Sequence, residues 1–191
     1  MSQLRMEKSD LENIPDLPLP EGYALRTYRE GDEGGIGRVY EAAGLGNTTA
    51  QEVRLKMIGD PCFTPGRLFV VERDGQLVGT AAAWRHPHDS DAGYLHMVGL
   101  LPEHRGKGLG ALLVVRAIRY TRQEGFRVQR LDTDDWREPA LRLYLNLGYY
   151  PLYVDETHPA RWQTLAARLN RPEILTRVRQ GTSLPPEATV A

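Results

Sequence analysis

The amino-acid sequence predicts a single α/β domain with a mixed sheet, and two observations lead to this class. Segments whose apolar residues recur at helical spacing are interleaved with short apolar runs, in the order strand, helix, three strands, helix, strand, helix, strand. The 191 residues, of which 41% are hydrophobic and 26% charged, have the length and composition of one ordinary globular domain.

The N-terminal part is expected to begin with an extended lead-in over residues 1–21, because three prolines within it disfavour a helix. The domain itself is expected over residues 22–158, opening with a strand at 23–28 and a helix at 33–43. Residues 44–66 are rich in Gly, Asn, Thr and Pro. They form either a substrate-side segment or a plain connecting loop.

A hairpin and two strand–helix units are expected next. The pair Asp74-Gly75 is the strongest hairpin signal in the chain and joins two apolar strands. Gly125 ends the longer helix, as expected of a residue that readily becomes left-handed. The segment 159–191 is expected to hold a C-terminal helix and a frayed tail from residue 181 onward. The predicted strands span residues 68–71, 77–84, 94–101, 128–133 and 149–154, and the predicted helices 108–124, 139–147 and 160–169.

The composition excludes several classes of partner. With 24 Lys and Arg against 25 Asp and Glu, the net charge is -1, and no global field attracts nucleic acid or an anionic membrane. Cys62, the only cysteine, excludes an internal disulfide and a thiolate zinc cage. No apolar run reaches the ~20 residues that span a bilayer, and residues 1–10 lack the apolar core of a signal peptide. The expected location is the cytoplasm.

The most informative segment is Arg105-Gly106-Lys107-Gly108-Leu109-Gly110, where a strand ends and a helix begins. Glycines let backbone N–H groups turn toward one point without a Cβ in the way. The start of a helix adds unpaired N–H donors and the positive end of its dipole. Arg105 and Lys107 add full charge. Together these features predict a loop that binds a diphosphate, against the alternative of a turn that holds nothing.

Two other phosphate motifs do not fit this loop. A Walker loop requires glycine where this chain has Leu101, and Ser or Thr where it has Gly108. The dinucleotide fingerprint Gly-x-Gly-x-x-Gly is not met either, because the glycines at 106, 108 and 110 follow the pattern Gly-x-Gly-x-Gly.

Two segments give the chain a specific resemblance. Arg105-x-x-Gly108-x-Gly110 matches the R-x-x-G-x-G/A signature of the GNAT superfamily of N-acetyltransferases, and residues 140–149, ALRLYLNLGY, resemble the family's A-x-x-x-Y-x-x-x-G-F/Y segment. With the strands before them, the resemblance covers roughly residues 22–155. It implies a mixed, mostly antiparallel central sheet flanked by helices. Part of this region also resembles the acetyltransferase domains of mycothiol synthase-like proteins.

The resemblance implies where coenzyme A is bound. The loop amides are expected to hold its pyrophosphate, and the thioester is expected along the strand 94–100, which splays from its neighbour in GNAT proteins. The amide of Val98 or Leu100 is the candidate oxyanion donor, and Gly99 marks a bulge or a close backbone approach. Arg137 stands where many relatives carry an asparagine that contacts the pantetheine arm. The expected cofactor-binding residues are Val98, Gly99, Leu100, Arg105, Gly106, Lys107, Gly108, Leu109, Gly110 and Arg137.

Acyl transfer to an amine needs a base for the ammonium, a donor for the oxyanion and an acid for the thiolate. His96 has a reference pKa of about 6.5, which suits a base, and strand alternation puts it on the face of Tyr94 and Val98. The equal alternative is a structural histidine. Tyr144 stands where the family's thiolate-protonating tyrosine stands, and a phenol of pKa ~10 can donate that proton. Its alternative is a core aromatic.

Other residues carry weaker signals. Two histidines and two aspartates within residues 86–91 lie in a polar loop without the spacing that fixes metal ligands, so no metal is expected. The three tryptophans are expected to be core residues or pocket walls: Trp84, Trp136 and Trp162.

The sequence thus predicts an N-acetyltransferase that moves an acetyl group from acetyl-CoA, as co-substrate, to a primary amine by direct attack in a ternary complex. The acceptor is a small molecule or a peptide, and a homodimer is open. No nucleic acid, membrane or metal is expected to take part. The alternative is a non-catalytic acyl-CoA-binding sensor or partner module that kept the loop and lost the chemistry.

Overall fold

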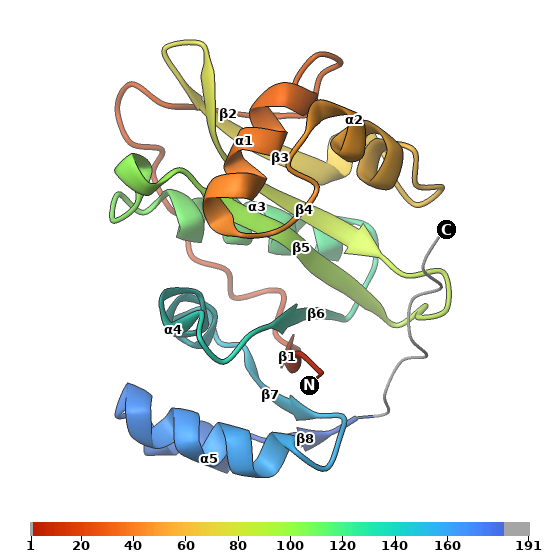
Figure 1. The fold of residues 1–191 in the computed structure, drawn as a ribbon. Helices are drawn as coiled ribbons and strands as arrows, with labels where there is room; N and C mark the ends of the chain where they lie inside the picture. The colour runs from red at the N-terminus through yellow and green to blue at the C-terminus, as the bar shows by residue number, and fades with distance from the viewer. Residues whose placement is uncertain (1, 182–191) are drawn as a thin grey trace. The chain divides into compact units, whose positions relative to one another are not determined.

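The structure is a computed structural model that describes residues 2–181. It divides into two compact units. One is formed by residues 9–131, and the other by the residues up to Lys8 together with those from Asp132 onward. Figure 1 traces the chain by colour from red to blue. The predicted frayed tail lies outside the described residues, apart from Gly181.

The larger unit is built on a sheet with the strand order β2-β3-β4-β5-β6. Neighbouring strands run antiparallel from β2 to β5, whereas β5 and β6 run parallel. The strands are β2 (Ala24–Thr27), β3 (Leu68–Arg73), β4 (Gln76–Arg85), β5 (Ala92–Leu100) and β6 (Val128–Thr133), of which β6 ends in the smaller unit.

Strands β3 and β4 form the predicted hairpin. Asp74 and Gly75 have φ angles of 51° and 75°, and two successive residues at positive φ give a turn that matches the twist of the flanking strands. The register pairs Arg73 with Gln76 across this turn. The local Asp-Gly signal was therefore enough to place the hairpin correctly.

Helices cover both faces of this sheet. Helix α1 (Glu33–Ala43) lies in front of the strands in Figure 1 and helix α3 (Leu109–Gln123) lies behind them. Each helix buries an apolar stripe against the sheet, with residues such as Ile36 and Val39 from α1 and Leu113 from α3. Between α1 and β3 the chain forms α2 (Ala50–Val53), a π-helix (Arg54–Ile58) and a 3-10 turn (Pro65–Arg67).

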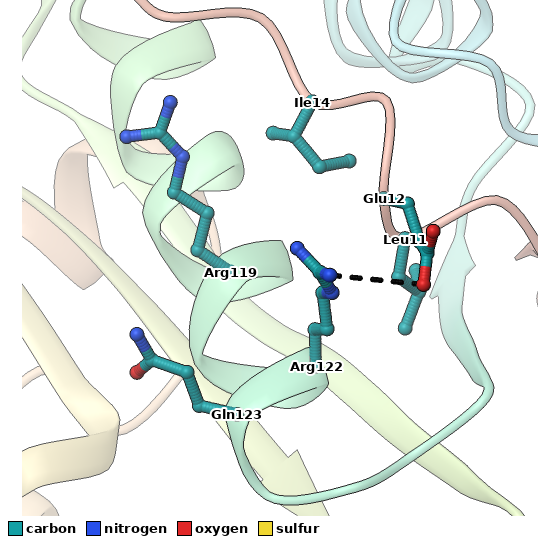
Figure 2. A pocket seen from close by; sticks show the side chains of 6 residues that line it. All are labelled: Leu11, Glu12, Ile14, Arg119, Arg122 and Gln123. Atoms are coloured by element: carbon teal, nitrogen blue, oxygen red, sulfur yellow. Dashed lines mark ion pairs between the residues drawn. The ribbon is translucent and has the colours of Figure 1, made fainter.

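The lead-in follows the outer side of α3 (Figure 2). Arg119 donates hydrogen bonds of 3.0 Å to the carbonyl oxygen of Pro15 and to the carboxylate of Asp16. Arg122 forms an ion pair of 3.6 Å with Glu12. These contacts border a hollow of about 440 Å³. None of the predicted site residues lines it; the lining residues are Leu11, Glu12, Ile14, Arg119, Arg122 and Gln123.

The smaller unit contains two strands that the sequence did not predict, at residues 4–8 and 179–180. Strand β1 (Leu4–Lys8) runs antiparallel to β7 (Tyr150–Tyr153), and the short β8 (Arg179–Gln180) runs parallel to β7. The expectation of a mere lead-in is therefore wrong for β1, which pairs within a sheet. Helices α4 (Glu138–Asn146) and α5 (His158–Leu169) and a 3-10 helix (Pro172–Thr176) complete the unit.

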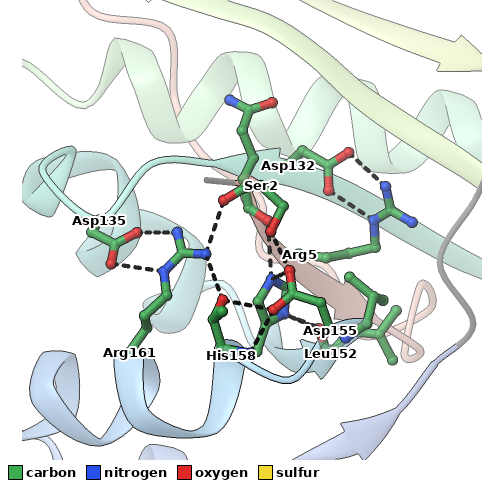
Figure 3. Close-up of polar contacts among 11 residues, drawn as sticks. Ser2, Arg5, Asp132, Asp135, Leu152, Asp155, His158 and Arg161 are labelled. Atoms are coloured by element: carbon green, nitrogen blue, oxygen red, sulfur yellow. Dashed lines mark hydrogen bonds and ion pairs between the residues drawn. The ribbon is translucent and has the colours of Figure 1, made fainter. Parts of the chain in front are cut away.

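Polar contacts fasten β1 within the smaller unit (Figure 3). Arg5 donates two hydrogen bonds to the carboxylate of Asp132, at 2.7 and 2.8 Å. Arg161 donates to the carbonyl oxygen of Ser2 at 2.9 Å. Both contacts join residues far apart in the sequence, so no local pattern signals this strand.

The predicted fold class, an α/β fold with a mixed and mostly antiparallel sheet flanked by helices, is confirmed. Parallel pairing joins β5 to β6 and β7 to β8. Within residues 2–181, every helix is too short or too polar to cross a bilayer.

Candidate functional site

Strand β5 carries a bulge in the segment predicted to face a thioester. Ala82 of β4 pairs with His96 of β5, and Thr80 of β4 pairs with Gly99 of β5. Between these two pairs the chain advances by two positions in β4 but by three positions in β5. One extra residue of β5 therefore lies between these pairs. Met97 has a φ of 52°, a left-handed conformation that is uncommon for a long side chain. The Thr80 hydroxyl donates a hydrogen bond of 2.9 Å to the Met97 carbonyl oxygen and so holds the bulge.

The sequence pointed to Gly99 rather than Met97 as the irregular position. Gly99 is required by close packing instead. A Cβ at this position would lie 3.0 Å from Val39 Cγ1 and 3.1 Å from Ala43 Cβ, both on α1. Gly99 is therefore a point of close approach, but side chains of α1 approach it rather than a backbone. The bulge lies earlier in β5. No residue type marks the bulge, because methionine is not typical of positive φ.

The bulge corrects the predicted faces of β5. Strict alternation put Val98 on the same face of the sheet as His96. Directly paired residues share a face, and the partners of His96 and Gly99 lie two positions apart in β4. Gly99, rather than Val98, therefore shares the face of His96. The imidazole of His96 is exposed, and its ring centroid lies 5.7 Å from that of Trp84 on β4. His96 therefore stands beside the bulge on the α1 face of the sheet.

Strand β5 loses its registered partner β6 before the bulge. The parallel register covers Ala92–Tyr94. On the opposite edge, the amide of Leu101 donates to the carbonyl oxygen of Val78 at 2.9 Å. Because successive residues of a regular strand direct their N–H groups to opposite edges, the amide of Leu100 points away from β4. The amide of Leu100, one of the two candidate oxyanion donors, thus lies on the edge that the parallel register with β6 has left.

The predicted diphosphate loop has a backbone that needs its glycines. A 3-10 turn, Pro102–His104, leads from β5 into the loop. Gly106 and Gly108 have φ angles of 74° and 81°, and nothing lies within 4 Å of a Cβ built on either. The backbone conformation, rather than crowding, selects glycine here, and it leaves both positions uncovered.

The loop ends at the N-terminus of α3, where Gly108 is the N-cap. The first intrahelical hydrogen bond runs from the Leu112 amide to the Gly108 carbonyl at 3.0 Å, so the amides of residues 109–111 are not used within the helix. Glycine has no side chain to cap them. The predicted diphosphate site depends on these donors and on the positive end of a 15-residue helix. The Leu109 side chain is fully buried, so only its amide can take part, and Gly110 follows in the first turn.

The two cations of the loop lie against carbonyl oxygens. Arg105 donates to Ala42 in the last turn of α1 at 3.1 Å and to Leu100 at 3.3 Å. Lys107 donates to Glu103 at 2.6 Å. Both side chains remain exposed. The sequence predicted their charge but could not predict that they also brace the loop.

Tyr144 lies on α4 in the smaller unit, and only 7% of it is exposed. Burial raises its pKa to about 12, against the opposing effect of the nearby Arg137 charge. The phenol therefore stays protonated at neutral pH, as a proton donor must. Its ring meets Tyr149 edge-on with the centroids 5.8 Å apart, so the alternative of a core aromatic also fits its surroundings.

Arg137 is the N-cap residue of α4. Its guanidinium donates to Asp134 at 3.0 Å and lies 4.3 Å from the ring centroid of Trp136. Trp136 is 67% exposed, so a core position is wrong for this residue, whereas Trp84 and Trp162 are buried. The predicted contact of Arg137 with a pantetheine arm stays a prediction.

Asp89, in the polar loop before β5, has a structural use. Its carboxylate accepts hydrogen bonds from the Tyr94 hydroxyl at 2.7 Å and from Arg130 at 2.5 Å. Burial acts to raise its pKa, but these two partners outweigh burial and leave the pKa below its usual value. Within the part of the chain that the structure describes, no three His, Cys, Asp or Glu residues gather as metal ligands.

Comparisons of the sequence with known proteins point to one family. The acetyltransferase (GNAT) family model matches residues 38–149. Mycothiol acetyltransferases from Thermomonospora curvata and Actinosynnema mirum are each 34% identical to the chain, over 148 and 154 residues. The alignments cover 74% and 77% of the chain but 49% and 51% of these relatives. The chain thus spans about half the length of the curated relatives it matches.

Solved structures are similar in fold. A GCN5-related N-acetyltransferase from Sphaerobacter thermophilus matches with a TM-score of 0.64 and 23% identity, over 79% of this chain and 49% of that one. A tandem GNAT protein from the clavulanic acid biosynthesis pathway matches with a TM-score of 0.61 and 20% identity, over 78% and 50%. At these identities the likeness concerns the fold alone.

Replacing Gly99 by alanine should destabilise the protein by about 1–3 kcal/mol, because the new methyl group would overpack against α1. Urea denaturation followed by tryptophan fluorescence measures the change. Gly34→Ala is the matched control on α1, where nothing lies within 4 Å of an added Cβ, and it should be neutral or stabilising. Unchanged stability of Gly99→Ala would contradict the packing argument.

Proposed function

The chain belongs to the acetyltransferase (GNAT) family, and on this premise we propose that it transfers an acetyl group from acetyl-CoA to a primary amine. The amine attacks the thioester directly while both substrates are bound. The observation that carries the proposal is the N-terminus of α3, where uncapped amides follow a glycine loop at the end of β5. Such an end favours a diphosphate through its donors and its dipole.

The residues of the larger unit suit the binding of coenzyme A. The amides of Gly108 and Gly110 and of their neighbours are the proposed donors to the phosphate oxygens, and the exposed charges of Arg105 and Lys107 add attraction. The amide of Val98 or Leu100 is the proposed donor to the thioester oxygen as it gains negative charge. Donors fixed in a strand need no reorganisation at that moment.

His96 is the proposed base. An alkylammonium with a pKa of about 10.4 is almost wholly protonated at neutral pH and must lose a proton before it can attack. His96 is exposed next to the bulge, so a proton can reach it directly or through water. A neutral imidazole accepts that proton at neutral pH.

Tyr144 is the proposed acid that protonates the departing thiolate. This assignment is supported by the family resemblance of residues 140–149 and by a pKa of about 12, which keeps the phenol protonated until the thiolate leaves. A thiol is a stronger acid than a phenol of this pKa, so the raised pKa keeps the proton on Tyr144 before the reaction but weakens the driving force for its transfer to the thiolate.

We propose a small-molecule amine as the acceptor. The relatives at 34% identity are named for a small molecule, mycothiol. A peptide amine is the alternative acceptor, and the homodimer and the cytoplasmic location stay predictions. The rival function, a non-catalytic acyl-CoA-binding module, requires binding without chemistry. Release of the coenzyme A thiol with a panel of primary amines separates the two functions.

Calorimetric titration with coenzyme A tests whether the loop at the N-terminus of α3 binds the diphosphate. Wild-type protein should bind, and Gly108→Glu should weaken binding by roughly a hundredfold, because a carboxylate would repel the diphosphate. Gly125→Glu is the matched control. It introduces the same side chain at a φ of 87° beyond the opposite end of α3, also with nothing within 4 Å of the added Cβ. Equal affinities of the two variants would refute the proposed binding loop.

Tyr144→Phe should lower kcat by on the order of a hundredfold, because the thiolate loses its acid. The dissociation constant of acetyl-CoA should stay unchanged, since the phenol makes its contribution only as the bond breaks. Thiol release measures kcat, and calorimetry measures affinity. A variant with wild-type turnover would return Tyr144 to the role of a core aromatic.

His96→Gln should lower kcat/KM by on the order of a hundredfold near neutral pH. In the wild type, kcat/KM should rise as the pH passes through the pKa of the imidazole, and this limb should be absent from the variant. The measurement is thiol release between acid and neutral pH with a fixed amine. The same pH profile in both proteins would leave His96 a structural residue.

A further inference from the structure

A cluster of polar side chains lies beside the diphosphate loop. The Tyr23 hydroxyl is 2.8 Å from His104 Nδ1, and Arg73 donates to the same hydroxyl at 3.4 Å. The Arg73 guanidinium also lies 5.2 Å from the centroid of the Tyr23 ring. His104 directly precedes Arg105, and Lys107 stands inside the loop. The cluster therefore borders the loop, and all its members belong to the larger unit.

The pKa of the Tyr23 phenol reflects the positive charge of this cluster. Its hydrogen bond with Arg73 and the charge of Lys107 lower its pKa, against the raising effect of burial. A phenol that ionises more easily than usual stands in a positive potential. The cluster thus adds to the field of the loop rather than offsetting it.

Among the described residues, carboxylates neutralise this cluster only weakly. The ion pair of Arg73 with Asp74 is 3.5 Å long, and the Asp74 side chain is 89% exposed. A pair of this kind contributes little in water. Lys107 donates to the carbonyl oxygen of Glu103, which carries no net charge. Positive charge is therefore left for an anion that approaches from solvent.

We propose that Arg73, His104 and Lys107 form a subsite for a phosphate monoester, namely the one that coenzyme A carries on its ribose. The proposal rests on the proposed function, because the loop must first hold the diphosphate. In coenzyme A the ribose alone separates the two anionic groups, and the cluster adjoins the loop, since His104 directly precedes Arg105 and Lys107 belongs to the loop. A monoester carries a charge of about -1.5 to -2 at neutral pH and has three acceptor oxygens.

Tyr23 is a positioning residue in this subsite. Its hydroxyl holds His104, at the exit of the 3-10 turn, and Arg73, at the end of β3. The hydroxyl therefore holds nitrogen atoms of two segments that are distant in sequence close to one another. A guanidinium offers paired N–H groups to phosphate oxygens, whereas an ammonium acts as a point charge.

Calorimetry with coenzyme A and 3′-dephospho-coenzyme A tests the subsite. The wild type should bind coenzyme A about tenfold more tightly than the dephospho analogue, the scale of one charge-assisted hydrogen bond. Arg73→Gln should lose most of this preference by binding coenzyme A more weakly, with its affinity for the analogue unchanged. Arg73→Lys should keep part of the preference, because it retains the charge.

Arg119→Gln is the matched control, since it removes an arginine from the outer side of α3. It should bind both ligands as the wild type does, and thermal melting checks that each variant is folded. Equal affinities of the wild type for the two ligands would overturn the subsite and leave the proposed function intact. A preference that persists in Arg73→Gln would also overturn it. If coenzyme A fails to bind the wild type, both proposals fall.

Discussion

The left-handed backbone of Met97, held by the hydroxyl of Thr80, is the constraint on which the arrangement of the larger unit depends. A regular strand would keep its N–H and C=O groups in ladders on both edges. The extra residue of β5 keeps the antiparallel pairing with β4 on both sides of the bulge, while the register with β6 ends at Tyr94. A residue such as methionine at positive φ costs about 1–3 kcal/mol. Strain of this kind persists only where the surrounding pairing determines it.

The other parts of the larger unit are placed with respect to this strand. Helix α1 rests on Gly99, where a side chain would separate helix and sheet. Helix α3 begins where the loop after β5 ends, so its uncapped amides stand at the carboxyl end of the strand. Arg105 connects the two helices, because its guanidinium reaches the last turn of α1 from the loop. One strand thus sets the positions of the proposed oxyanion donor, the proposed base and the proposed diphosphate loop.

The sequence was sufficient wherever the signal was local. Helical spacing predicted α1, the Asp74-Gly75 pair predicted the hairpin, and glycines beside a helix start predicted the loop. It was insufficient where partners are distant. Strand β1 is fixed by contacts such as that of Arg5 with Asp132, and the bulge by a hydroxyl on the neighbouring strand. Alternation therefore misplaced Val98. The roles of His96 and Tyr144 came from the resemblance and stay predictions, because geometry alone does not assign chemistry.

The positive φ of the glycines around α3 has a consequence for handedness. Gly108 before the helix and Gly125 beyond it have φ angles of 81° and 87°. Residues of D configuration favour this region of φ, as the mirror image of the preference of L residues. A semisynthetic protein with D-alanine at position 125 should be more stable by up to about 1 kcal/mol, since its unfolded chain has fewer conformations to lose. The same replacement at position 108 would keep the backbone shape while adding a methyl group to the loop. D residues can therefore separate the two properties for which the loop needs glycine. One is a backbone at positive φ, and the other is the absence of a side chain.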